Sequence, residues 1–208
     1  MEAESRDAGP SAPLMSAIVT EHFVLQSAAG TTVSEAIGRS SLYLSALSSS
    51  LIALGFAAQT PGLLSPFAAA ALPTVFLLGV FTSARLVDTG VQNVLYLSGI
   101  ARIRGYYRTL DPEAARYFAR WGASEGETDD ALGSLAVKSG PLAGLFTAAS
   151  VIAIINGVLA GVCLALLTYN LVTDHHLPAA LAVGLVTAAA CLTVFFRYQH
   201  HRYLSVQR

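Results

Sequence analysis

Charged side chains are scarce in this 208-residue chain. Only 12% of its residues are Asp, Glu, Lys or Arg, whereas soluble domains carry about 25%. Hydrophobic residues make up 54%, and the formal net charge is −1. A near-neutral chain with so few basic residues offers little to a polyanion, so we expect no nucleic-acid partner. The deficit of charge instead indicates an integral membrane protein.

Groups that carry chemistry are also few. Cys163 and Cys191 are the only cysteines, and each lies in an apolar stretch, so they predict packing rather than a disulfide. The histidine pairs 175–176 and 200–201 have no acidic or cysteine cluster at ligand spacing, so we expect no metal. No phosphate-binding glycine loop, nucleophile elbow or HExxH motif occurs. We therefore expect no cofactor and no enzymatic activity.

The apolar residues fall into four blocks, approximately residues 41–59, 67–84, 142–172 and 179–196. A helix needs roughly 20 mainly apolar residues to cross the hydrocarbon core of a bilayer. The blocks predict an all-α, polytopic membrane protein, a bundle of four transmembrane helices. No Asp, Glu, Lys, Arg or His lies at mid-membrane depth, which disfavours proton relays and ion-coupled transport.

The distribution of basic residues predicts the orientation. The connections "TPGLLSP" and "TDHHL" contain no Lys or Arg, whereas the N-terminal segment, the central region 85–138 and the C-terminal tail contain all twelve. By the positive-inside rule, we expect a multi-pass protein of the cell inner (plasma) membrane with both termini in the cytoplasm.

We expect six segments along the chain: a disordered tail 1–11, an interfacial amphipathic helix 12–30, a first transmembrane pair 32–87, a cytoplasmic helical hairpin with an acidic loop 88–140, a second transmembrane pair 141–197 and a cytoplasmic tail 198–208. Gly30 is predicted to end the interfacial helix, and Thr32 with Glu35 forms a capping-box pattern that predicts a new helix start. Glu35 and Arg39 are spaced to pair on one helix face.

The second span is predicted to continue out of the bilayer, because no proline interrupts residues 74–110 after Pro73. Asp111-Pro112-Glu113 then predicts the start of a short amphipathic helix that carries Tyr117 and Phe118 on one face.

The cytoplasmic hairpin contains a basic and aromatic cluster that we interpret as a binding surface for lipid headgroups or for an acidic protein partner of unknown identity. Its members are Arg102, Arg104, Tyr106, Tyr107 and Arg108.

Small residues recur every four positions in the third span and again in the fourth, a spacing that lets helix backbones approach closely. They predict packing of the third span against the fourth, or association between subunits, and we expect a homo-oligomer. The helix-packing candidates are Ala153, Gly157, Gly161, Ala165 and Gly184.

Polar residues lie along one face of the first span: Ser41, Ser45, Ser48 and Gln59. Hydroxyl groups on a membrane helix usually bond to their own preceding carbonyls or to a neighbouring helix. An alternative is that this face lines the pore of an oligomeric ion channel or membrane-permeabilising assembly.

Two stretches, "EAIGRSSLYLSALSSSLIAL" and "RIRGYYRTLDPEAARYF", resemble a group of uncharacterised small actinobacterial four-span integral membrane proteins over residues 21–118. The single lysine beside eleven arginines agrees with a GC-rich bacterial genome. The resemblance implies four spans and a cytoplasmic centre, and no activity. The chain is more distantly similar to the membrane effector modules of bacterial conflict systems, which have two spans and permeabilise membranes, but the second pair of spans departs from that plan.

Overall fold

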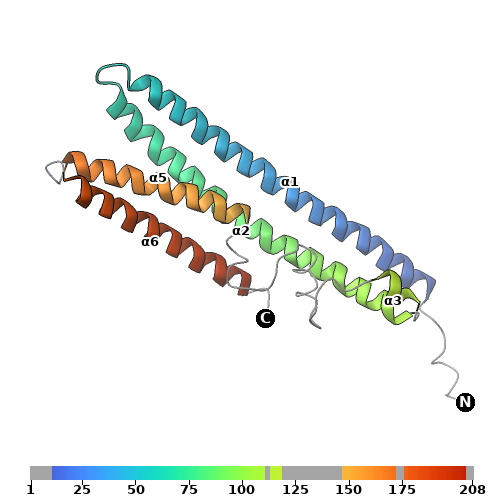
Figure 1. Cartoon of the computed structure of the whole chain (residues 1–208). Helices are drawn as coiled ribbons and strands as arrows, with labels where there is room; N and C mark the ends of the chain where they lie inside the picture. Colours follow the sequence, from blue (N-terminus) through green and yellow to red (C-terminus); the bar gives the residue numbers. More distant parts are fainter. Residues whose placement is uncertain (1–10, 111–112, 119–146, 172–175, 205–208) are drawn as a thin grey trace, which may run out of the picture. The chain divides into compact units, whose positions relative to one another are not determined.

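The computed structural model describes residues 11–110, 113–118, 147–171 and 176–204, and every element among them is helical (Figure 1). These elements are α1 (Ala12–Ala57), α2 (Leu64–Leu110), α3 (Ala114–Tyr117), α5 (Ala148–Leu171) and α6 (Leu177–Leu204). Four of them, α1, α2, α5 and α6, are long and apolar enough to cross a membrane. The prediction of an all-α protein with four candidate spans is thereby confirmed.

The chain divides into two compact units. The described part of the first, which we call the hairpin unit, combines residues 12–34 of α1 with residues 90–110 of α2 and with α3. The described part of the second, the bundle unit, combines residues 35–57 of α1 and 64–89 of α2 with α5 and α6.

The two longest helices differ in how well they match their predictions. α2 continues without a break to Leu110, as predicted. α1 also continues, through Gly30 and Thr32, so the predicted helix end at Gly30 and new start at Thr32 are wrong. A glycine costs a helix interior only about 1 kcal/mol, which tertiary contacts can offset. Within the hairpin unit, the Thr32 hydroxyl lies 3.1 Å from Oδ1 of Asn93 on α2, and Leu25 packs over Gly99.

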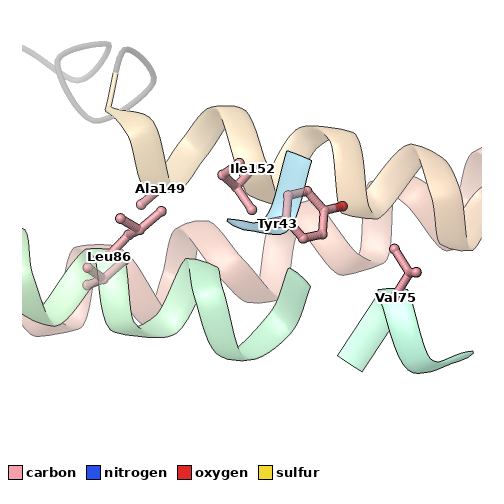
Figure 2. Packing of buried hydrophobic residues seen from close by; sticks show 6 residues of the cluster. Tyr43, Val75, Leu86, Ala149 and Ile152 are labelled. Carbon is pink, nitrogen blue, oxygen red and sulfur yellow. The ribbon is translucent and has the colours of Figure 1, made fainter. Parts of the chain in front are cut away.

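The bundle unit is an up-down-up-down arrangement of helices. A turn over residues 58–63 joins α1 to α2, and Gly62 adopts a φ of +78°, a left-handed conformation that favours glycine. α5 and α6 pack against each other along their length, antiparallel (Figure 1). The core cluster draws Tyr43 from α1, and Figure 2 shows Val75 and Leu86 of α2 with Ala149 and Ile152 of α5.

Polarity in the bundle unit is inverted relative to a soluble protein. Large apolar side chains lie on the outside, among them Leu42 (71% exposed) and Leu185 (72%). Polar side chains lie inside, among them Asn156 and Gln199 (each 4% exposed). Ser150 of α5 is fully buried, and its hydroxyl lies 3.3 Å from Oε1 of Gln199 on α6. Such a surface suits contact with lipid, where the apolar exterior costs nothing.

The remaining segment predictions fall largely outside what the structure describes. The tail 1–10, Asp111 and Pro112, residues 119–146, residues 172–175 and the last four residues are not described. α3 supplies one turn of the helix predicted after Glu113. Whether residues 12–30 lie at a membrane interface stays a prediction.

Candidate functional site

The basic and aromatic cluster of the hairpin unit lies on the last turns of α2. Arg102 is exposed, whereas Arg104, Tyr106, Tyr107 and Arg108 are half-buried. The half-burial shows that most of the cluster packs against other parts of the hairpin unit rather than extending fully into the surroundings.

Aromatic contacts connect this cluster to α1 and to the end of α3. The ring centroids of Tyr107 and Phe118 are 5.1 Å apart, and those of Tyr107 and His22 are 6.4 Å apart. The Arg108 guanidinium donates a long hydrogen bond, 3.5 Å, to the backbone carbonyl of Phe118. Tyr107 therefore lies between α1 and the segment after α2, and Arg108 joins the same segment to α2.

The surroundings of His22 disfavour a positive charge on its imidazole ring. Burial, followed by the repulsion of nearby Arg104, lowers the pKa of His22 below its ordinary value of 6.5. His22 is consequently neutral at pH 7, and its Nδ1 atom is buried without a hydrogen-bond partner. Protonation of His22 would add a cation beside Arg104, which the aromatic surroundings solvate poorly.

The small residues of α5 and α6 lie where these two helices meet. A Cβ atom added to Gly161 would stand 2.6 Å from the carbonyl oxygen of Gly184, and one added to Gly184 would stand 2.8 Å from Cβ of Ala165. Gly157 faces the side chain of Leu192 on α6, and Ala153 is buried. The backbones of the two helices thus touch at Gly161 and Gly184, within one chain.

The predicted serine face of α1 lies on the outside of the bundle unit. Ser41, Ser45, Ser48 and Gln59 are all exposed, whereas Tyr43, between the first two serines, is fully buried in the core cluster. The described bundle therefore has no channel lined by these serines within one chain, and a pore that used them would need neighbouring subunits.

Asn156, in the middle of the third span, is expected from the sequence to bond to a neighbouring helix, but its partners could not be predicted. The Tyr43 hydroxyl donates to Oδ1 of Asn156 (3.3 Å), and Nδ2 of Asn156 donates to the carbonyl of Phe76 (3.1 Å). Gly79 makes room for both, because a Cβ there would clash with the Asn156 amide and stand 2.8 Å from the Tyr43 ring. The signal was a tyrosine hydroxyl and an amide within apolar segments, which must find partners in hydrocarbon.

The sequence also did not predict most of a chain of ion pairs at the end of the bundle unit, which we call the charged network. It runs Arg39–Glu35–Arg85–Asp88–Arg202 and joins α1, α2 and α6. Only its first pair was predicted, and the 2.8 Å distance from Arg39 Nε to Glu35 Oε1 confirms that pair. Asp88 and Arg202 are 114 positions apart, a separation from which no sequence pattern indicates contact.

Neither the described residues nor known proteins supply a ligand. In the described parts of the chain, no group of three or more His, Cys, Asp or Glu side chains could hold a metal ion, and Cys163 and Cys191 are free thiols. Compared with protein-family models, curated proteins and solved structures, the chain matches none. The resemblance to small actinobacterial membrane proteins stays a prediction.

Proposed function

We propose that the chain is a non-enzymatic, self-associating protein of the bacterial plasma membrane whose hairpin unit binds an acidic partner in the cytoplasm. The observation that carries the proposal is the packed cluster around Tyr107, whose ring lies near those of His22 and Phe118. Arg108 bonds to the Phe118 carbonyl, and Arg102 and Arg104 precede it on the same last turns of α2. Arginines held in place lose less entropy when they bind a carboxylate, and their planar donors suit bidentate recognition.

A partner in the aqueous phase is favoured over lipid headgroups for this cluster. Seventeen positions separate Arg85 from Arg102 in the sequence, a chain length that corresponds to about 26 Å of helix at 1.5 Å per residue. The headgroup layer on each side of the hydrocarbon is only about 5–8 Å thick. The cluster is therefore better placed for a soluble protein surface.

The cytoplasmic orientation of the hairpin unit rests on charge. Four crossings return the chain to its starting side, and the two connections without Lys or Arg occupy the other side. A reporter fused after the last residue should be active in the cytoplasm, while one inserted next to Gly62 should be active only outside. The opposite result at either point contradicts the orientation.

Binding through the cluster is tested with an acidic peptide of ten glutamates and the full chain in zwitterionic lipid discs. Replacing Arg102, Arg104 and Arg108 together by Gln should abolish the salt-sensitive binding, whereas Arg197→Gln, which removes an exposed arginine of α6, should leave it unchanged. Equal binding by the two variants, or no binding by the parent chain, contradicts the acidic-partner proposal.

Self-association is supported by the outward face of α1, where Gly30, Gly38 and Gly55 have nothing within 4 Å of an added Cβ. Small residues that make no packing contact within the chain allow a helix of another subunit to approach closely. The subunit count in native-like membrane discs tests self-association directly, and a monomer would contradict the proposal.

A second candidate function is an oligomeric pore lined by the same face, because Ser41, Ser45 and Ser48 are all exposed on it. Ser45→Cys should then react with a soluble thiol reagent in a conducting assembly, while Leu185→Cys, at a 72% exposed apolar position of α6, should not. Failure of Ser45→Cys to react would exclude this lining.

A further inference from the structure

The charged network brings two arginines to one point. Arg39 Nε lies 2.8 Å and Arg85 Nη2 lies 3.5 Å from the same oxygen, Oε1 of Glu35. The two nitrogen atoms are therefore no more than about 6 Å apart, on neighbouring helices of the bundle unit. Two guanidinium cations this close repel each other unless an anion lies between them.

The described part of this network contains more guanidinium groups than carboxylates, since three of the former face two of the latter. The arginines are also the more exposed partners: the side chains of Arg39 and Arg85 are 41% and 49% exposed, and that of Glu35 is 32% exposed. The bonds to Glu35 use one N–H of each guanidinium, and a guanidinium has five.

The network lies at the depth of lipid phosphates. Arg39 precedes the first apolar block by two residues, about 3 Å of helix, and Arg85 directly follows the second block. Arginines at the ends of spans extend their charged ends to the interface. One turn further into the apolar segments the exposed side chains are apolar instead. Leu42 and Phe81 are 71% and 67% exposed there, as lipid-facing side chains would be.

We propose that Arg39 and Arg85 bind the phosphate of an anionic phospholipid headgroup, and that Glu35 competes with this lipid for the same two guanidiniums. The proposal rests on membrane insertion and not on the acidic partner of the hairpin unit. Glu35 is ionised at neutral pH, as a carboxyl group ordinarily is, and the Arg39 hydrogen bond lowers its pKa further.

The experiment compares retention of phosphatidylglycerol with that of phosphatidylcholine by the purified full chain, using native mass spectrometry. The double variant Arg39→Gln/Arg85→Gln should lower the preference for phosphatidylglycerol about 30-fold. Each arginine near a membrane surface strengthens the binding of anionic lipid about fivefold, and the two factors multiply. The matched control, Arg102→Gln/Arg104→Gln, removes the same charge from the hairpin unit and should leave the preference unchanged.

Glu35→Gln is the decisive variant, since it retains both arginines and removes their competitor. The preference for phosphatidylglycerol should rise about fivefold. If the network were purely structural, the preference should fall instead, because removing Glu35 would weaken the contact of α1 with α2 and Arg39 and Arg85 would move apart. A fall in Glu35→Gln therefore overturns the proposal, even if the double arginine variant fails to fold.

Three further outcomes also overturn it. If the hairpin control loses the preference as strongly as the double variant, the attraction follows overall charge rather than this site. If inorganic phosphate displaces phosphatidylglycerol, the site belongs to a soluble anion. A parent chain with no preference for phosphatidylglycerol removes the basis of the proposal altogether.

Discussion

The helix pairs of the bundle unit are held together in different ways. α5 and α6 touch backbone to backbone at Gly161 and Gly184, so their axes approach closely. α1 reaches α2 and α5 through side chains instead, with the Glu35–Arg85 ion pair and the Tyr43–Asn156 hydrogen bond. The glycines of α1 take no part in these contacts, because Gly38 and Gly55 have open space around an added Cβ.

The difference shows that small residues have two different roles in this chain. Small residues in α5 and α6 are required by the fold of a single chain, whereas those of α1 lie on its outer face and are free for a contact outside the chain. A substitution of glycine should therefore have opposite effects in the two places. The predictions that follow test this contrast, from the largest expected effect to the smallest.

Gly161→Ala should cause the largest loss of stability, toward the upper end of about 1–3 kcal/mol. The new Cβ would stand 2.6 Å from the carbonyl oxygen of Gly184, and a backbone atom cannot rotate away, so α5 and α6 must separate. The free energy of unfolding in detergent, followed by far-ultraviolet circular dichroism, measures this loss. A change below about 0.5 kcal/mol would mean that the helices do not touch here.

Gly79→Ala should cost less, about 1–2 kcal/mol, because its neighbours are side chains that can turn away at the expense of their hydrogen bonds. The amide of Asn156 and the ring of Tyr43 occupy the space that the new methyl group needs. Asn156→Ala in the Gly79→Ala background should recover part of the loss. Strictly additive losses in this double-mutant cycle would show that the two positions are not in contact.

Gly38→Ala should raise the stability of the subunit by about 0.5–1 kcal/mol, since alanine is the better residue in a helix interior and nothing lies within 4 Å. If the outer face of α1 forms the subunit interface, the same variant should lower the subunit count in membrane discs. A loss of stability in the isolated subunit would contradict the open environment of Gly38.

Acidification should have the smallest effect. The hydrogen bond from Arg39, with the nearby charge of Arg85, lowers the pKa of Glu35 in the folded state below 4.5. Its contribution to stability is therefore present above about pH 4.5 and is lost as the pH falls through the lower, folded-state pKa. Glu35 is partly exposed, so the difference in Tm between the parent chain and Glu35→Gln at pH 7 should be at most about 2 °C, and it should shrink as the pH falls below 4.5. A difference that does not shrink on acidification would assign the effect to packing.

The sequence predicted those parts of the fold that depend on composition along one segment. The lack of charge in four blocks predicted four membrane-length helices, and the absence of proline after Pro73 predicted that α2 continues to Leu110. The break at Gly30 was predicted from a local pattern and is wrong, because the contact of Thr32 with Asn93, 61 positions away, supports one continuous helix.

The candidate sites also divide into those predicted from a pattern within one segment and those that depend on contacts between distant segments. Of the small residues that the four-residue spacing identified, Gly157, Gly161, Ala165 and Gly184 lie at the contact of α5 with α6, and Ser41, Ser45 and Ser48 of α1 are exposed. The spacing could not say which face of α1 turns inward, and the answer is the face of Tyr43. Apart from its Glu35–Arg39 pair, the charged network could not be predicted from the sequence, because Arg202 of α6 and Asp88 of α2 meet only in the folded chain.

The turn between α1 and α2 has a consequence for how the protein enters the membrane. From Ser41 to Ala84 the chain has no Asp, Glu, Lys, Arg or His, and within the turn the backbone N–H groups of Gln59, Thr60 and Leu63 all donate to nearby carbonyls. Carrying this turn across the hydrocarbon therefore transfers no formal charge and leaves these three donors satisfied. The first helical pair can insert as a single folded element during synthesis, before the ribosome has made the residues of α5.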